Sequence, residues 1–230
     1  MKVMNPKPTI GFIGAGNMGL PMVKNLIKKG FQVKVYDINP KITKRLDKDN
    51  IKAVNNLRAV ANNKFIISIL PDTQDVENVF STDSGINTYL KPGTIVIDMS
   101  TISATSASEI GKTLQKQQIE FLDAPVSGGV KGALNANLSI MVGGKKETYK
   151  KSLDILNAIG ENIIYAGRLG MGQVFKVCNQ IMVGSHIQAM CEAFTLCKSK
   201  GGDLKLLKET LIGSSANSWI LDNLGDDVTD

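Results

Sequence analysis

The sequence predicts an α/β fold in which a doubly wound β-sheet is followed by an all-helical region. Up to about residue 165, short apolar runs rich in β-branched residues alternate with amphipathic helical patterns. This alternation is typical of a parallel sheet that is covered by helices on both faces. Beyond it, Gln173–Lys200 has no proline and one glycine, which indicates a single long helix. We therefore expect two domains, residues 1–165 and residues 166–230.

The expected elements follow from these patterns. The strands are Thr9–Ile13, Gln32–Tyr36, Phe65–Ile69, Thr94–Asp98, Glu120–Asp123, Leu138–Val142 and, more weakly, Asn162–Tyr165. The helices between them are Met18–Lys29, Pro40–Asp47, Val76–Phe80, Ser106–Lys116 and Glu147–Ile159. The long helix is apolar around most of its circumference, so we expect it to be buried. Two more helices are expected after it, at Asp203–Ile212 and Ser218–Leu224. Residues 1–8 form a polar lead that we expect to be loose.

Composition excludes several classes of protein. The 230 residues are 43% hydrophobic and 21% charged, which is close to the average of globular proteins. No run approaches the ~18 apolar residues of a membrane-spanning helix, so no membrane partner is expected. The net charge of +6 comes from scattered lysines, and aromatic residues make up only 5% of the chain. A nucleic-acid surface needs basic residues concentrated on one face, so no nucleic-acid partner is expected either.

Cysteine and histidine usage argues against a metal site. Cys178, Cys191 and Cys197 fit no zinc-binding spacing, and we expect them to be reduced and buried in a cytoplasmic protein. The one histidine, His186, excludes a multi-histidine site. Acid–base chemistry is therefore expected to fall to Lys, Asp or Glu.

A glycine-rich loop follows the first expected strand. In the segment GFIGAGNMG, Gly14 permits a tight turn, Gly16 allows close approach of a pyrophosphate, and Gly19 allows the next helix to pack against the strand. Asn17 and Met18 complete the loop, and the free N–H groups at the start of the helix would hold phosphates. A tight turn without a ligand is the alternative, but the strand before the loop and the helix after it favour a dinucleotide site.

Asp37 strengthens this interpretation. It follows the second expected strand directly, at a position where a carboxylate accepts hydrogen bonds from the ribose hydroxyls of a dinucleotide and repels a 2′-phosphate. NAD is therefore favoured over NADP, although the nearby Lys41 and Arg45 could weaken the preference.

Two further loops follow strands at the same edge of the sheet. Leu70 and Pro71 are expected on the adenine-ribose side of the cofactor, and Thr101 on the nicotinamide side. Both loops could instead be ordinary turns, since Ser103 fits the N-cap of a helix.

Two segments are candidates for substrate binding. Ser127, Gly128 and Gly129 follow a strand, and their successive N–H groups could bind a carboxylate or phosphate, unless they form a plain loop. Near the start of the long helix, Lys176, Asn179 and Gln180 share one face. A lysine on an apolar helix either has a lowered pKa suited to acid–base chemistry or extends its amine to solvent.

Taken together, these motifs resemble the β-hydroxyacid dehydrogenase family, which includes 3-hydroxyisobutyrate dehydrogenase, tartronate semialdehyde reductase and, more distantly, 6-phosphogluconate dehydrogenase. The resemblance rests on GFIGAGNMGLPM, VIDMSTIS, DAPVSGGVKGA and GMGQVFKVCNQ, in that order, and extends from about Thr9 to the end of the chain. It implies a Rossmann NAD(P)-binding domain, then a helical domain, in a homodimer or homotetramer.

The resemblance also implies roles for individual residues. Ser127, Gly128 and Gly129 match the site of the substrate carboxylate. Lys176 matches the catalytic lysine, which exchanges a proton with the substrate oxygen while hydride passes between NAD and the carbinol carbon. Many members have the substrate-binding asparagine four places after that lysine, where this chain has Gln180. We nevertheless expect Asn179 to take that role, with Gln180 as the alternative.

The chain departs from the family most clearly near its end. Relatives usually continue for about 60 residues with further helices and a second lysine motif, so the helical domain is expected to be C-terminally truncated. The sequence thus predicts a 3-hydroxyisobutyrate-like dehydrogenase. The alternatives are a tartronate semialdehyde-type reductase and a truncated homologue that binds NAD but has weak activity.

Overall fold

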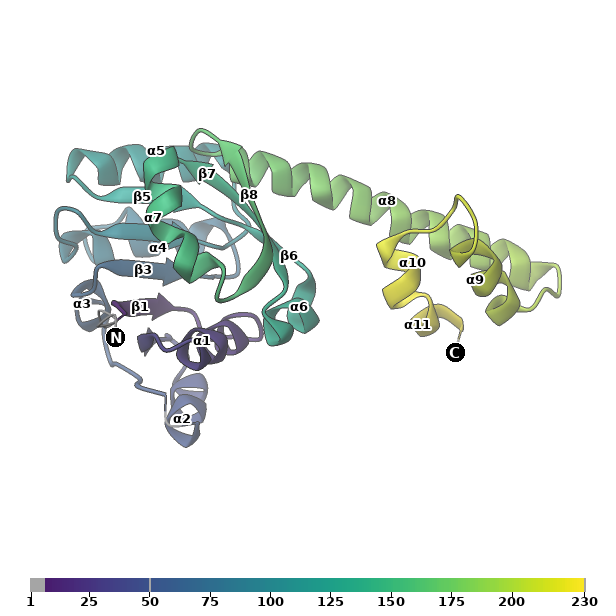
Figure 1. Cartoon of the computed structure of the whole chain (residues 1–230), viewed down its shortest axis with the longest axis horizontal. Helices are drawn as coiled ribbons and strands as arrows, with labels where there is room; N and C mark the ends of the chain where they lie inside the picture. Colours follow the sequence, from purple (N-terminus) through teal and green to yellow (C-terminus); the bar gives the residue numbers. More distant parts are fainter. Residues whose placement is uncertain (1–6, 50, 230) are drawn as a thin grey trace, which may run out of the picture. The chain divides into compact units, whose positions relative to one another are not determined.

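The computed structural model describes residues 7–49 and 51–229, so most of the expected loose lead lies outside the described residues. The chain divides into two compact units, Met1–Lys176 and Val177–Asp230. The first contains the β-sheet and the second contains only helices among its described residues (Figure 1). The expected order, an α/β domain and then a helical region, is confirmed. The division falls inside a continuous helix, and the domain boundary between 165 and 166 stays a prediction.

The sheet has eight strands within the described residues. They are β1 (Thr9–Ile13), β2 (Gln32–Tyr36), β3 (Phe65–Ser68), β4 (Ile95–Asp98), β5 (Glu120–Asp123), β6 (Val126–Ser127), β7 (Leu138–Gly144) and β8 (Gly160–Gly167). Their order is β2-β1-β3-β4-β5-β7-β6, and β8 pairs with β7. The first five strands are parallel, as the sequence predicts.

The sheet is not parallel throughout. Strand β7 runs antiparallel to β5 and β6, and parallel to β8. The segment between Ser127 and Leu138 is shorter than the dozen or so residues that a parallel crossover needs, so β7 must return beside β6 in the opposite direction. The expected parallel arrangement therefore holds for β1–β5, whereas β7 is antiparallel to β5 and β6.

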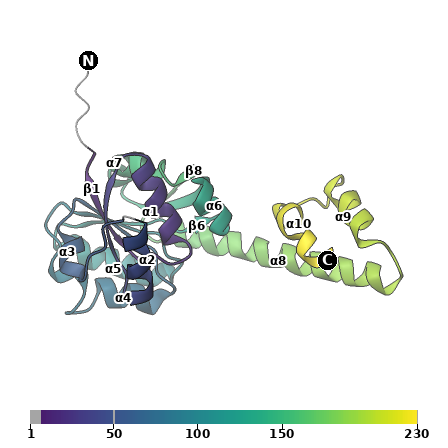
Figure 2. The same cartoon turned by 90° about the horizontal axis from the view of Figure 1, so that it is seen from below.

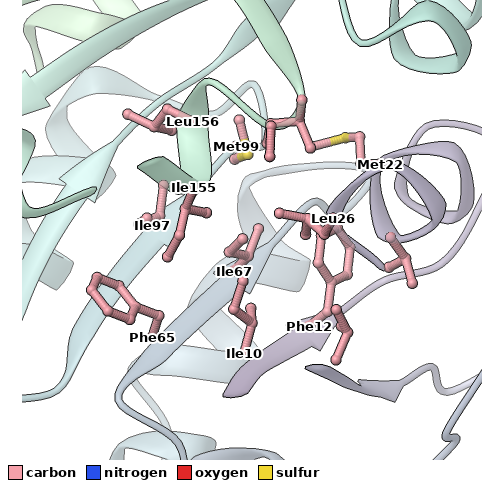
Figure 3. Packing of buried hydrophobic residues seen from close by; sticks show 14 of the residues in the cluster. Ile10, Phe12, Met22, Leu26, Phe65, Ile67, Ile97, Met99, Ile155 and Leu156 are labelled. Carbon is pink, nitrogen blue, oxygen red and sulfur yellow. The ribbon is translucent and has the colours of Figure 1, made fainter. Parts of the chain in front are cut away.

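Helices cover both faces, which confirms the doubly wound arrangement. One face carries α1 (Gly19–Lys28), α2 (Pro40–Lys48), α6 (Gly129–Asn135) and α7 (Lys146–Leu156). Figure 3 shows Met22 and Leu26 of α1 over Phe12 and Ile67 of the sheet, with Ile155 and Leu156 of α7 packed in the same core. The other face carries α3 (Leu57–Ala61), α4 (Thr73–Phe80), the 3-10 turn Ile86–Thr88 and α5 (Ala104–Lys116). The sequence missed α3 and α6, which have 5 and 7 residues and are shorter than the window of about 11–18 residues in which helical periodicity can be recognised.

The second unit has a small core of its own. Helix α8 (Met171–Ser199) begins in the first unit and continues into the second, followed by α9 (Leu204–Ile212), α10 (Trp219–Leu224) and α11 (Asp226–Thr229). Met190 and Phe194 of α8 pack against Ile220 and Leu221 of α10, and Figure 2 shows α9 and α10 beside the C-terminal half of α8. None of the described helices combines the length and apolarity needed to cross a membrane.

Much of α8 is less buried than its composition suggests. The exposed apolar side chains on this helix include Val177, Ile181, Met182 and Leu196, the last at 62% exposure. Cys178 and Cys191 are exposed and Cys197 is partly exposed; all three are free thiols. The expectation of a buried helix with buried cysteines was wrong for this chain, because the described residues supply few elements that pack against α8.

Candidate functional site

The predicted cofactor residues lie at the carboxyl ends of parallel strands. The chain leaves β1 for β2 on one side and later places β3 on the other side of β1. Such a reversal of strand order marks the edge at which open α/β sheets bind ligands.

The glycine loop after β1 has the geometry that its sequence predicts. Gly14 has φ of +91°, and a Cβ there would lie 2.3 Å from the carbonyl oxygen of Ile69. A Cβ on Gly19 would lie 1.9 Å from the carbonyl oxygen of Gly14, so only glycine permits α1 to start this close to the loop. By contrast, a Cβ on Gly16 would meet nothing within 4 Å. The packing explains Gly14 and Gly19, while the open surface at Gly16 fits the approach of a pyrophosphate.

Asp37 contacts the glycine loop directly. Its Oδ2 accepts a hydrogen bond of 2.7 Å from the backbone N–H of Ala15, and its Oδ1 accepts one of 2.8 Å from Asn39. Asn17 is exposed and Met18 is half-buried in the same loop. The structure therefore brings Asp37 and the glycine loop together, in an arrangement that fits a dinucleotide.

The loops after β3 and β4 are connected at this edge by a partly buried hydrogen bond. The backbone N–H of Leu70 donates to Oγ of Ser100 at 2.8 Å. Leu70 is half-buried, and Pro71 and Thr101 are exposed. Oγ of Ser103 accepts a hydrogen bond from the N–H of Ser106, which confirms the expected N-cap of α5.

Beneath these loops lies a fully buried carboxyl group. Oδ1 of Asp98 accepts hydrogen bonds from the hydroxyls of Ser68 at 2.8 Å and Ser100 at 2.6 Å. Oδ2 of Asp98 is buried without a hydrogen-bond partner among the described residues. Burial disfavours the charged form and raises the pKa of Asp98 to about 6, with a smaller contribution from the negative charge of Asp123.

Asp123, at the end of β5, caps the beginning of α8. Its Oδ1 accepts a hydrogen bond of 2.7 Å from the N–H of Gly170, and its Oδ2 accepts one of 3.0 Å from the N–H of Gln173. A negative group here also interacts favourably with the helix dipole. Burial nevertheless raises the pKa of Asp123, and the backbone N–H groups oppose this rise.

Gln173 makes a second connection between α8 and the sheet. Its side-chain amide donates to the carbonyl oxygen of Ser100 at 2.8 Å, and its Oε1 accepts from the N–H of Ile102 at 3.1 Å. Gln173 is fully buried. The start of α8 is therefore fixed to the ends of both β4 and β5.

Lys176 lies one turn after Gln173. It is only 8% exposed, and burial lowers the pKa of its amine. A lowered pKa leaves more of the neutral amine, which can accept a proton, near neutral pH. The structure thus places Lys176 in an environment that suits acid–base chemistry.

The other candidate substrate residues lie on two elements. Ser127 ends β6 and pairs with Ser139 of β7, and the next two residues adopt positive φ values of 120° at Gly128 and 60° at Gly129. On α8, Oδ1 of Asn179 is buried and has no hydrogen-bond partner in the described part of the chain. A buried acceptor of this kind calls for an explanation, and a bound ligand is one.

The sequence reasoning assigned no role to Asp98, Asp123 or Gln173, although all three lie inside the motifs that it singled out. The signal available was the residue type, since Asp98 ends an apolar strand and Asp123 follows the apolar pair Phe121 and Leu122. A charged residue in such a position is either paired, hydrogen-bonded or functional.

Two family models together match nearly the whole chain. Residues 9–167 match the NAD binding domain of 6-phosphogluconate dehydrogenase. Residues 170–230 match a domain described as the NAD-binding domain of NADP-dependent 3-hydroxyisobutyrate dehydrogenase.

Individual relatives agree with these matches. The chain is 37% identical over 220 residues to the mitochondrial 3-hydroxyisobutyrate dehydrogenase of Mus musculus, covering 95% of this chain and 66% of that protein. It is 38% identical over 214 residues to the NAD-dependent L-serine dehydrogenase of Pseudomonas aeruginosa, covering 93% and 72%. The solved structure of 3-hydroxyisobutyrate dehydrogenase from Mycobacterium tuberculosis with L-serine superimposes with a TM-score of 0.85 at 34% identity, covering 94% and 74%.

These matches extend over both parts of the described fold, and the chain spans about two thirds to three quarters of the length of these relatives. The glycine loop, Asp37 and the buried lysine therefore occur in a chain that belongs to the β-hydroxyacid dehydrogenase family, a family of NAD(P)-binding oxidoreductases that includes the 3-hydroxyisobutyrate dehydrogenases.

Proposed function

We propose that this protein oxidises a small β-hydroxyacid, similar to 3-hydroxyisobutyrate, with NAD as the hydride acceptor. The observation that carries the proposal is the buried Lys176, whose pKa is lowered and whose helix is fixed to two strand ends by Asp123 and Gln173. A rigidly placed amine with a lowered pKa is well suited to take a proton from a hydroxyl group.

In this proposal the residues of the chain have separate tasks. Gly14–Gly19 and Asp37 hold the dinucleotide, with Leu70 and Pro71 on its adenine-ribose side and Thr101 on its nicotinamide side. The bound NAD supplies the acceptor for hydride from the carbinol carbon. Ser127, Gly128 and Gly129 bind the substrate carboxylate, and Asn179 orients the hydroxyl group.

The proton is handled by Lys176. During oxidation, its neutral amine accepts the hydroxyl proton as the carbonyl group forms, and during reduction its ammonium group returns that proton to the carbonyl oxygen. Asn179 is preferred to Gln180 as the orienting residue because its buried Oδ1 lacks a hydrogen-bond partner in the described structure.

The preference for NAD over NADP rests on Asp37. Its carboxylate lies within hydrogen-bond distance of the glycine loop, where it would repel a 2′-phosphate and accept from ribose hydroxyls. We also propose a homodimer or homotetramer, since the exposed apolar side chains of α8 are typical of an interface. The three free cysteines favour a reducing, cytoplasmic type of compartment, although several relatives are named as mitochondrial.

The experiment is a substrate panel followed by nicotinamide absorbance. It should include 3-hydroxyisobutyrate, L-serine and tartronate semialdehyde, each with NAD(H) and NADP(H), together with calorimetric titration of NAD. Turnover of a hydroxyacid with NAD supports the proposal. Turnover that is confined to tartronate semialdehyde supports the reductase alternative, and NAD binding without any turnover supports the weakly active homologue.

A further inference from the structure

A cavity lined by none of the cofactor-loop residues has a polar lining that is mostly basic. Its volume is about 800 Å³, and its polar lining includes Lys34, Lys52, Arg58 and Lys91 together with Tyr89 and Asn62. Among the described residues, no carboxylate lines it. The volume lies within the range of ~300–1,000 Å³ that is usual for small-molecule sites.

Two of the lysines are held next to each other by the backbone. The segment after α2 pairs with β2 through a parallel bridge between Val35 and Ala53. The N–H of Val35 donates to the carbonyl oxygen of Lys52 at 2.9 Å. This register places Lys34 opposite Lys52 on the face that α3 covers, and like charges opposite each other in a sheet destabilise it.

The remaining charges come from elements that are distant in sequence. Arg58 lies on α3, and Lys91 lies in the loop before β4, where its amine donates to Oδ1 of Asn62 at 2.8 Å. None of the ion pairs found among the described residues involves Lys34, Lys52, Arg58 or Lys91. The fold therefore gathers four positive charges around one cavity without neutralising them by described carboxylates.

The cavity is lined by residues at other positions on the sheet than those of the cofactor loops. Asn62 precedes β3 and Lys91 precedes β4, so the cavity reaches the amino ends of these strands, whereas the glycine loop and Asp37 follow the carboxyl ends of β1 and β2. The cavity also includes Lys34 of β2, which lies three residues before Asp37, or about 10 Å along the strand, so the cavity contacts the sheet at a different level from the cofactor loops.

We propose that this cavity is a second ligand site, which binds a compact anion with three or more negative charges through phosphate or carboxylate oxygens. The guanidinium group of Arg58 suits bidentate contacts with either group, and the lysines supply point charges. Lys34 and Lys52 then gain a shared counter-ion that offsets their mutual repulsion. The inference does not depend on the proposed dehydrogenase activity.

The test is calorimetric titration of the whole chain with pyrophosphate and, separately, with citrate, in the presence of saturating NAD. A prior titration with NAD reports on the cofactor site by itself. The double variant Lys52→Gln/Arg58→Gln removes two charges from the cavity. The matched control, Lys112→Gln/Lys116→Gln, removes two exposed charges from α5.

We expect saturable binding of one equivalent of at least one anion to the wild type and the control, and at least tenfold weaker binding to the cavity variant. The same anion should raise the thermal midpoint of the wild type and the control more than that of the cavity variant. The pyrophosphate and citrate titrations distinguish a phosphate ligand from a carboxylate ligand. No saturable binding to the wild type, or equal weakening in the two double variants, would overturn the proposal.

Discussion

Asp123 and Gln173 are joined by a hydrogen bond of 3.0 Å from the backbone N–H of Gln173 to Oδ2 of Asp123. This bond connects the end of β5 to the first turn of α8, and Lys176 lies one turn further along the same helix. The carboxylate at the end of β5 thus fixes the helical turn that precedes the proposed catalytic amine.

Asp123→Asn should therefore destabilise the protein. An amide can accept only one of the two N–H groups, and its own NH₂ group would face the other, so we expect a loss of about 2–4 kcal/mol in the free energy of unfolding. Urea denaturation measures this change. Asp154→Asn, on the exposed surface of α7, is the control and should change stability by less than about 0.5 kcal/mol. Equal stability of the two variants would show that Asp123 does not anchor α8.

Substitutions at two glycines of the loop should distinguish effects on NAD binding from effects on the stability of the fold. Gly16→Ala places a Cβ in open space, so stability should stay within about 0.5 kcal/mol of the wild type. NAD affinity should nevertheless fall at least tenfold, or about 1.4 kcal/mol, because the methyl group occupies the path of the pyrophosphate.

Gly19→Ala should behave differently. Its Cβ would lie 1.9 Å from the carbonyl oxygen of Gly14, so α1 must shift. We expect the free energy of unfolding to fall by about 1–3 kcal/mol. Calorimetry and urea denaturation of both variants make the comparison. Unimpaired NAD binding in Gly16→Ala would contradict the assignment of the loop to the cofactor.

Asp37 should control the choice of cofactor. Asp37→Asn removes the negative charge that repels a 2′-phosphate and weakens the hydrogen bond to Ala15. We expect NAD to bind about tenfold more weakly and the ratio of NADP affinity to NAD affinity to rise. Titration with both cofactors measures the ratio, and an unchanged ratio would exclude Asp37 as its determinant.

The buried Asp98 should make stability depend on pH in an unusual direction. Its pKa in the folded chain is about 6, above the ordinary 3.8, so the folded state binds more protons than the unfolded state between these values. Stability from this group is therefore present at low pH and is lost as pH rises through 6. Between pH 7 and pH 5 the wild type should gain about 1 kcal/mol more than Asp98→Asn. Urea denaturation at the two pH values tests this, and an equal gain in both proteins would place the pKa of Asp98 near its ordinary value.

Much of the fold follows from sequence patterns because the strands of the first domain are short apolar runs between recognisable helices. Such runs predict β1–β5 well, but they do not specify the direction of β7, which depends on the length of the segment after Ser127. The burial of α8 was overestimated, because composition shows that a helix is apolar without showing whether other elements cover it. Cys178 and Cys191 are exposed because few of the described elements pack against this helix.

The site could be predicted in part. Glycine spacing and Asp37 indicate a dinucleotide loop because each residue type has a specific backbone or charge requirement. The tasks of Asp123 and Gln173 depend on contacts between residues about 50 positions apart, which a single sequence does not show. The relation of Lys176 to Ser127, Gly128 and Gly129 stays a prediction.

The most direct test of the proposed function is the turnover of Lys176→Ala with the best hydroxyacid of the panel, alongside its affinity for NAD. Lys150→Ala, an exposed lysine of α7, is the matched control. We predict a turnover about 10²–10⁴-fold below wild type for Lys176→Ala, with unchanged NAD affinity and a normal control. Near-normal turnover of Lys176→Ala with NAD binding intact would contradict the assignment of this lysine as the acid–base group.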